Sequence, residues 1–132
     1  MHAANNTKAA LVIDDDEIHH EIIAAALERY NFSEILRAMD GEAARSIVED
    51  QRDRIGLILC DLYMPNFDGI EFLLSLKECD YKPPLLLVSG AKEQFLRSAE
   101  ELAKVNGLDL IGGLPKPVDF HRFHETLKQR FG

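Results

Sequence analysis

The chain contains no tryptophan, only two cysteines, and no apolar run of bilayer length. Cys60 and Cys79 have no CxxC partner, so reduced thiols fit better than a disulfide framework. Crossing a bilayer takes about 20 apolar residues, and the N-terminus lacks the hydrophobic region of a signal peptide. We therefore expect a cytoplasmic protein without membrane contact.

Basic residues are outnumbered by acidic ones. The chain has 15 Lys and Arg against 23 Asp and Glu, a formal net charge of -8. A nucleic-acid-binding face needs clustered Lys and Arg to neutralise phosphates, so direct DNA or RNA binding is not expected. With 132 residues, 46% hydrophobic and 29% charged, the composition is that of one globular domain. We expect a flexible leader over residues 1–8 and one domain over residues 9–132.

Apolar runs of strand length alternate five times with segments of helical spacing. The predicted strands cover residues 9–13, 34–38, 55–60, 85–88 and 110–114. The predicted helices cover residues 17–30, 43–48, 70–76, 95–103 and 120–131. This order predicts an α/β fold: a three-layer (βα)5 doubly wound parallel five-stranded sheet of the flavodoxin-like type.

The first helix carries an apolar stripe formed by Ile18, Ile22, Ala26 and Tyr30, which Ile23 and Leu27 widen. We expect this stripe to face the core. His19 and His20 occupy adjacent positions, point in different directions and are expected to be exposed. His121 and His124 share a face of the last helix without a third ligand, and we interpret them as surface or packing residues.

Polar side chains follow four of the predicted strands. Asp14 and Asp15 follow the first strand, and Asp61 ends the third. Ser89 follows the fourth strand and Lys116 the fifth. In an open α/β sheet ligands bind at the carboxyl ends of the strands, so we expect these groups to converge.

Three carboxylates repel one another unless a cation joins them. An oxygen-only site with few protein ligands suits Mg²⁺, which often completes its shell with water and a phosphate oxygen. The same residues suit phosphoryl transfer, with Asp61 as the nucleophile and the Lys116 ammonium holding charge on the phosphoryl oxygens. Ser89 can donate a hydrogen bond, and Gly90 leaves room for a phosphoryl group close to the backbone.

Over residues 9 to 130 the chain resembles the receiver domain of two-component response regulators. Four motifs carry the resemblance: the run from Leu11 to Glu17, the Asp61 segment with Met64-Pro65 and Asp68-Gly69, Leu87-Val88-Ser89-Gly90, and Lys116-Pro117. The resemblance implies that Asp61 is the phospho-acceptor and that Asp15, Asp61 and the Tyr63 main-chain carbonyl are magnesium ligands. It further implies that Asp14 holds the metal through water, that Ser89 and Lys116 contact the phosphoryl group, and that the Lys116–Pro117 peptide bond is cis.

The acidic motif allows two assignments, and the lysine motif departs from the usual pattern of the family. Asp15 and Asp16 form an alternative pair in the acidic run, although we favour Asp14 and Asp15 because they directly follow the strand. The family usually has an aromatic residue three positions before the lysine, whose ring swings inward on phosphorylation. Here that residue is Gly113, so the signal is expected to pass through Ser89, the loop after it and the helix at 95–103.

The resemblance implies a signalling domain that takes a phosphoryl group from a histidine kinase or phosphotransfer protein. It would catalyse only its own phosphorylation and dephosphorylation. Switching, and homodimer formation if it occurs, would involve the helix at 95–103, the strand at 110–114 and the last helix. The stretch from Asn106 to Pro117 resembles receivers attached to EAL-type cyclic-di-GMP phosphodiesterases, which implies a C-terminal output domain.

Two other functions fit parts of the sequence. A receiver-fold interaction module that is never phosphorylated is slightly favoured by Gly113. A magnesium phosphohydrolase of the haloacid-dehalogenase type would use Asp14 as nucleophile with Ser89 and Lys116, but its final acidic motif is absent and Asp61 stays unexplained.

Overall fold

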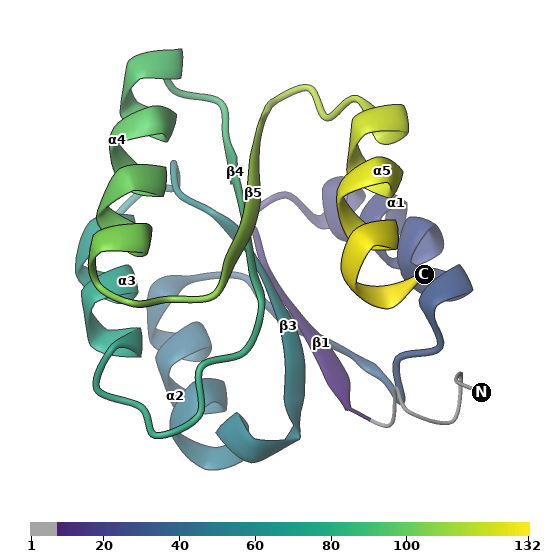
Figure 1. The fold of residues 1–132 in the computed structure, drawn as a ribbon, viewed down its shortest axis with the longest axis horizontal. Helices are drawn as coiled ribbons and strands as arrows, with labels where there is room; N and C mark the ends of the chain where they lie inside the picture. The colour runs from purple at the N-terminus through teal and green to yellow at the C-terminus, as the bar shows by residue number, and fades with distance from the viewer. Residues whose placement is uncertain (1–7) are drawn as a thin grey trace.

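In the computed structural model, which describes residues 8–132, five parallel strands form one sheet between two helical layers (Figure 1). The strands are β1 (Ala9–Ile13), β2 (Ile35–Ala38), β3 (Ile55–Asp61), β4 (Leu85–Ser89) and β5 (Leu110–Pro115). Their order in the sheet is β2-β1-β3-β4-β5, so the predicted doubly wound fold is confirmed. Most of the expected leader, residues 1–7, lies outside the described residues.

The helices follow the strands in the predicted order. They are α1 (Glu17–Leu27), α2 (Gly41–Gln51), α3 (Gly69–Leu76), α4 (Glu93–Val105) and α5 (Phe120–Phe131), with short 3₁₀ helices η2 (Glu28–Tyr30) and η3 (Arg52–Arg54). Four of the α-helices begin at an aspartate whose side chain accepts backbone N–H groups of the first turn: Asp16, Asp40, Asp68 and Asp119. Acidic caps at these positions satisfy otherwise unpaired donors and complement the helix dipole.

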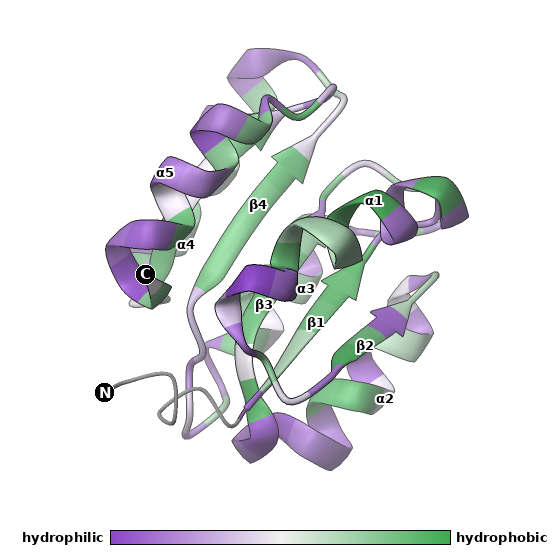
Figure 2. Cartoon of the chain, turned by 90° about the vertical axis from the view of Figure 1, so that its right-hand side faces the viewer, coloured by the Kyte–Doolittle hydropathy of each residue, from purple (hydrophilic) through white to green (hydrophobic). Residues whose placement is uncertain are grey.

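The strands are buried because helices cover both faces of the sheet. Helices α1 and α5 lie on one face and α2, α3 and α4 on the other (Figure 1). Alternate residues of β1 show how the core divides: Ala10 and Val12 pack with α1 and α5, whereas Leu11 and Ile13 pack with the opposite layer. Figure 2 shows β1, β3 and β4 as hydrophobic ribbons, which is the pattern expected of parallel strands buried on both faces.

Helix α1 faces the core with only part of the stripe that we predicted. Ile18 and Ile22 have exposed fractions of 71% and 45%, whereas His20, Ile23 and Leu27 are buried. The predicted stripe is therefore correct for Ile23, Leu27 and Tyr30 and wrong for Ile18 and Ile22, whose i, i+4 spacing fits an outer face as well as an inner one.

Helix α4 ends at the Asn106-Gly107 pair. Gly107 adopts a left-handed φ of 75°, its N–H donates to the Lys104 carbonyl, and the Leu108 N–H donates to the Ala103 carbonyl. This pair of bonds closes the helix and returns the chain to β5. In the described part of the chain, no helix is long and apolar enough to cross a membrane.

The topology brings the ends of β1 and β3 together. The chain leaves β1 for β2 on one side and then crosses back to β3 on the other, and β1 and β3 pair directly. Adjacent strands whose connections run in opposite directions leave a crevice at their carboxyl ends. The fold therefore places the residues that follow β1 beside the last residue of β3.

Candidate phosphoryl-transfer site

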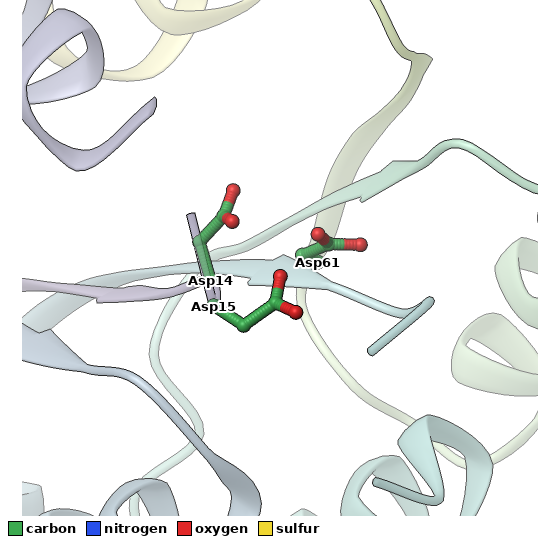
Figure 3. Close-up of side chains that lie close together, drawn as sticks. All are labelled: Asp14, Asp15 and Asp61. Carbon is green, nitrogen blue, oxygen red and sulfur yellow. The ribbon is translucent and has the colours of Figure 1, made fainter. Parts of the chain in front are cut away.

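Three aspartates meet at the crevice between β1 and β3. Asp14, Asp15 and Asp61 each offer one carboxylate oxygen, and these oxygens lie within 4.8 Å of one another (Figure 3). Asp14 and Asp61 are almost wholly buried, whereas Asp15 is exposed. A magnesium ion fits this donor set, because it is all oxygen and leaves one side open for water and a phosphoryl group.

Asp16 has a different position from the other acids of the run. Its Oδ1 accepts the Ile18 N–H at 2.9 Å and the His19 N–H at 3.4 Å, so it caps α1. It does not belong to the group of three carboxylates. The local geometry thus favours Asp14 and Asp15, rather than Asp15 and Asp16, as the acidic pair.

The ammonium group of Lys116 lies between two of the carboxylates. Lys116 Nζ is 2.8 Å from Asp61 Oδ2 and 3.2 Å from Asp14 Oδ2. Burial favours the neutral amine, but the bonds and charges of Asp61 and Asp14 outweigh it and raise the pKa of Lys116. The Lys116 main-chain N–H donates to the Ser89 carbonyl at 2.9 Å, and the Lys116–Pro117 bond is cis as the resemblance implied.

Asp61 is held by one backbone donor and one ammonium. Its Oδ1 accepts the Tyr63 N–H at 2.9 Å, and its Oδ2 accepts from Lys116. Burial raises the pKa of Asp61, and the hydrogen bonds from Lys116 and Tyr63 reduce that rise without cancelling it. The Tyr63 side chain is exposed at the rim.

Asp14 is satisfied more fully than Asp61. Its Oδ1 accepts the Asp16 N–H at 2.9 Å, and its Oδ2 contacts both His19 Nδ1 and the Lys116 ammonium. Burial would raise the pKa of Asp14, but the bonds from His19, Asp16 and Lys116 lower it from 3.8 to about 2. Asp14 is therefore a fixed anion.

The prediction that His19 and His20 are exposed is wrong. His20 is 1% exposed and its Nε2 lies 2.7 Å from the Asp14 main-chain carbonyl, while the His19 side chain is 14% exposed and contacts the Asp14 carboxylate. Sequence reasoning missed these two contacts with Asp14 because it considered the histidines only as joint ligands of one ion. Neighbouring positions of a helix cannot bind one ion together, so both side chains were expected to be exposed. The signal available was two histidines in the first turn of a helix directly after strand-end acids.

Ser89 and Gly90 border the site at the end of β4. Ser89 is buried at the end of β4, and its Oγ accepts the Ala91 N–H at 3.1 Å. A Cβ added to Gly90 would first meet the Lys116 side chain, at 3.9 Å, so this glycine lies next to the lysine. The five polar side chains that the sequence singled out, Asp14, Asp15, Asp61, Ser89 and Lys116, thus all lie at the carboxyl end of the sheet.

Gly113 stands where the family usually has an aromatic residue, and a carboxylate fills the space beside it. Gly113 lies in β5, and a Cβ built on it would come within 2.6 Å of Glu100 Oε2. The Glu100 side chain, which comes from α4, therefore covers the face of β5 where an inward-swinging ring would project.

The comparisons with known proteins agree with this geometry. The "Transcriptional regulatory protein ZraR" of Salmonella typhimurium is 33% identical over 90% of this chain and 25% of its own length. The "Cyclic di-GMP phosphodiesterase RocR" of Pseudomonas aeruginosa is 29% identical over 92% of this chain and 31% of its own. The chain thus spans about a quarter to a third of these relatives.

Solved structures share the fold. A crystal structure of a response regulator from Colwellia psychrerythraea superposes with a TM-score of 0.76 at 27% identity, covering 92% of this chain and 94% of that one. Residues 10–128 match the family described as the response regulator receiver domain. With the acidic strand ends, the serine and the lysine in the order of that family, the chain belongs to the receiver domains of two-component response regulators.

Proposed function

We propose that Asp61 accepts a phosphoryl group in this chain and that magnesium is required. Phosphorylation-dependent switching is the general function of receiver domains, which act in signalling by way of histidine kinases or phosphotransfer proteins. The observation that carries the proposal is the Lys116 ammonium, which lies between Asp61 and Asp14 beside the open carboxylate of Asp15.

The metal would be held directly by Asp15, Asp61 and the Tyr63 main-chain carbonyl, and by Asp14 through water. This division is the one that the family resemblance implies. It is supported by the number of donors, since Asp14 has three protein donors, Asp61 has two and the Asp15 carboxylate is exposed. A magnesium ion bound there would neutralise charge on the phosphoryl oxygens.

The chain's own residues would then carry out an in-line displacement. An Asp61 carboxylate oxygen forms a bond to phosphorus while the N–P bond of the donor phosphohistidine breaks, and the electron pair of that bond stays on the histidine nitrogen. Lys116 moves from the Asp61 carboxylate to a phosphoryl oxygen. The Ser89 hydroxyl donates a hydrogen bond to another phosphoryl oxygen, because its present bond to Ala91 uses only the oxygen as acceptor.

The output and partners follow from the same proposal. A phosphoryl group on Asp61 would pull Ser89 and the loop after it, and so shift α4 against β5 and α5. That face would meet a C-terminal output domain, a partner or a second copy of the chain. The similarity to RocR supports an EAL-type phosphodiesterase as the output, whereas ZraR is named as a transcriptional regulator.

The test is the intact mass of the protein after incubation with acetyl phosphate and Mg²⁺. We expect one phosphoryl adduct on the wild type, none with EDTA and none on Asp61→Asn. Asp80→Asn is the matched control, because Asp80 is an exposed aspartate remote in sequence from the strand-end acids. No adduct on the wild type would contradict the proposal and leave an unphosphorylated interaction module. An adduct that required Asp14 as its attachment point would favour the hydrolase.

A further inference from the structure

Two consecutive histidines of α1 both bond to Asp14. His20 Nε2 lies 2.7 Å from the Asp14 main-chain carbonyl, and His19 Nδ1 contacts Asp14 Oδ2. They reach Asp14 on different atoms because adjacent residues of a helix point in different directions. The pair therefore fixes both the backbone and the side chain of one acid.

The partner atoms determine where each imidazole carries its proton. A carbonyl oxygen only accepts, so His20 donates from Nε2, and its buried Nδ1 has no hydrogen-bond partner among the described residues. The Asp14 Oδ2 atom that His19 contacts is a carboxylate oxygen, which accepts, so His19 donates from Nδ1. A polar ring buried at 1% exposure with one unpaired nitrogen is costly, and here it holds the main chain of Asp14 in place.

His19 and Lys116 share one oxygen of Asp14, and the Asp16 N–H takes the other. Three donors on one carboxylate fix the plane of the group. If His19 were absent, Oδ2 would keep only the long contact to Lys116, and the carboxylate could turn about its last torsion.

We propose that His19 is a positioning residue of the magnesium site: its Nδ1–H holds the Asp14 carboxylate in the orientation that receives a metal-bound water. The proposal rests on the function proposed above and adds a residue to it. Hydrogen bonds that orient the groups around a metal are typically worth 10- to 100-fold in metal affinity. Because Asp14 acts through water, the lower end of that range, about 10-fold, is expected.

The experiment compares three substitutions of His19 in the intact chain. His19→Asn retains an N–H at the position of Nδ1, His19→Gln places its N–H nearer to the position of Nε2, and His19→Ala has none. His121→Ala is the matched control, because the His121 side chain is 82% exposed on α5. Magnesium chloride is titrated into each protein while amide chemical shifts are recorded by NMR, which measures binding without any turnover.

We expect the Ala and Gln variants to bind Mg²⁺ about 10-fold more weakly, and the Asn and His121→Ala proteins to bind like the wild type. Phosphorylation by acetyl phosphate should slow in the Ala and Gln variants at limiting Mg²⁺ and recover at saturating Mg²⁺. If His19 had only a structural role, the His19→Asn and His19→Gln variants would bind Mg²⁺ equally well. Their rate of phosphorylation would also not recover at saturating Mg²⁺.

Two results would overturn the inference. One is unchanged magnesium affinity in His19→Ala; the other is an Asn variant as weak as the Gln variant, a comparison that stands even if His19→Ala does not fold. Failure of the proposed function gives a different pattern, in which the wild type itself neither binds Mg²⁺ nor forms an adduct.

Discussion

The carboxylate of Glu100 on α4 lies over Gly113 of β5, so close that a Cβ on Gly113 would come within 2.6 Å of Glu100 Oε2. Glycine at this position lets a side chain of the neighbouring helix approach the strand. The space beside Gly113, where the family resemblance led us to expect an aromatic ring, is therefore occupied by a flexible acidic side chain.

Gly113→Ala should displace Glu100 rather than distort the strand. The nearest atoms to the added Cβ belong to the far end of a flexible side chain, and the backbone at Gly113 is extended. We expect the free energy of unfolding to fall by less than about 1 kcal/mol in a urea titration. The cost should shrink when Gly113→Ala is combined with Glu100→Ala, since the clash is then gone. A loss of several kcal/mol that Glu100→Ala fails to relieve would show that the strand itself cannot accept a side chain.

Lys116→Met should make the protein more dependent on magnesium. The substitution removes the ammonium that Asp61 and Asp14 share and leaves two buried carboxylates facing each other. Without metal the free energy of unfolding of the variant should fall by on the order of 2 kcal/mol, because removing one partner of a buried ion pair leaves an uncompensated charge. The rise in Tm on adding Mg²⁺ should therefore be larger than in the wild type. Lys104→Met, an exposed lysine on α4, is the control. An equal or smaller rise in Lys116→Met would contradict competition between lysine and metal.

Asp14 should make the metal-free protein sensitive to strong acid. Its pKa is lowered to about 2 in the folded state from 3.8, so the stabilisation is complete above pH 4 and is lost as the pH falls through 2. A depression of this size corresponds to roughly 2 kcal/mol. Unfolding followed in EDTA should show that the difference in stability between wild type and Asp14→Asn shrinks from pH 4 to pH 2. A difference that stays constant over this range would show that Asp14 is not held ionised by its donors.

Phe123→Ala should be among the most damaging single changes in the core. Phe123 is fully buried on α5, where it packs in the layer that α1 and α5 form against the sheet, 5.3 Å from the Phe120 ring. Truncating a buried phenylalanine typically costs about 3–5 kcal/mol, through lost burial and the cavity left behind. Val105→Ala is the comparison, because Val105 is 79% exposed and should change stability by less than about 0.5 kcal/mol. Similar losses for the two variants, measured by denaturant unfolding, would show that α5 does not anchor this layer.

The strands were predictable from the sequence to within one residue at either end. Continuous apolar runs such as residues 55–60 and 85–88 leave no exposed face, so they indicate parallel strands covered on both sides. Helix starts were predicted less closely, since α2 and α4 begin two residues before the predicted ranges 43–48 and 95–103; the aspartates that cap four of the five helices were a signal that the prediction did not use. The orientation of α1 was predicted only in part: Ile23, Leu27 and Tyr30 face the core as expected, whereas the isoleucines at 18 and 22 have the spacing of a buried stripe and lie outside.

The sequence by itself determined which chemical groups stand at the strand ends: carboxylates after β1 and β3, a hydroxyl after β4 and an ammonium after β5. Strand length and hydrophobicity set those positions, and parallel pairing brings them to one edge. Only the tertiary structure decided how each group is paired, since hydrogen bonds between residues far apart in sequence depend on side-chain direction. It turned His20 inward, placed His19 on Asp14, shared Lys116 between two aspartates and filled the space above Gly113 with Glu100.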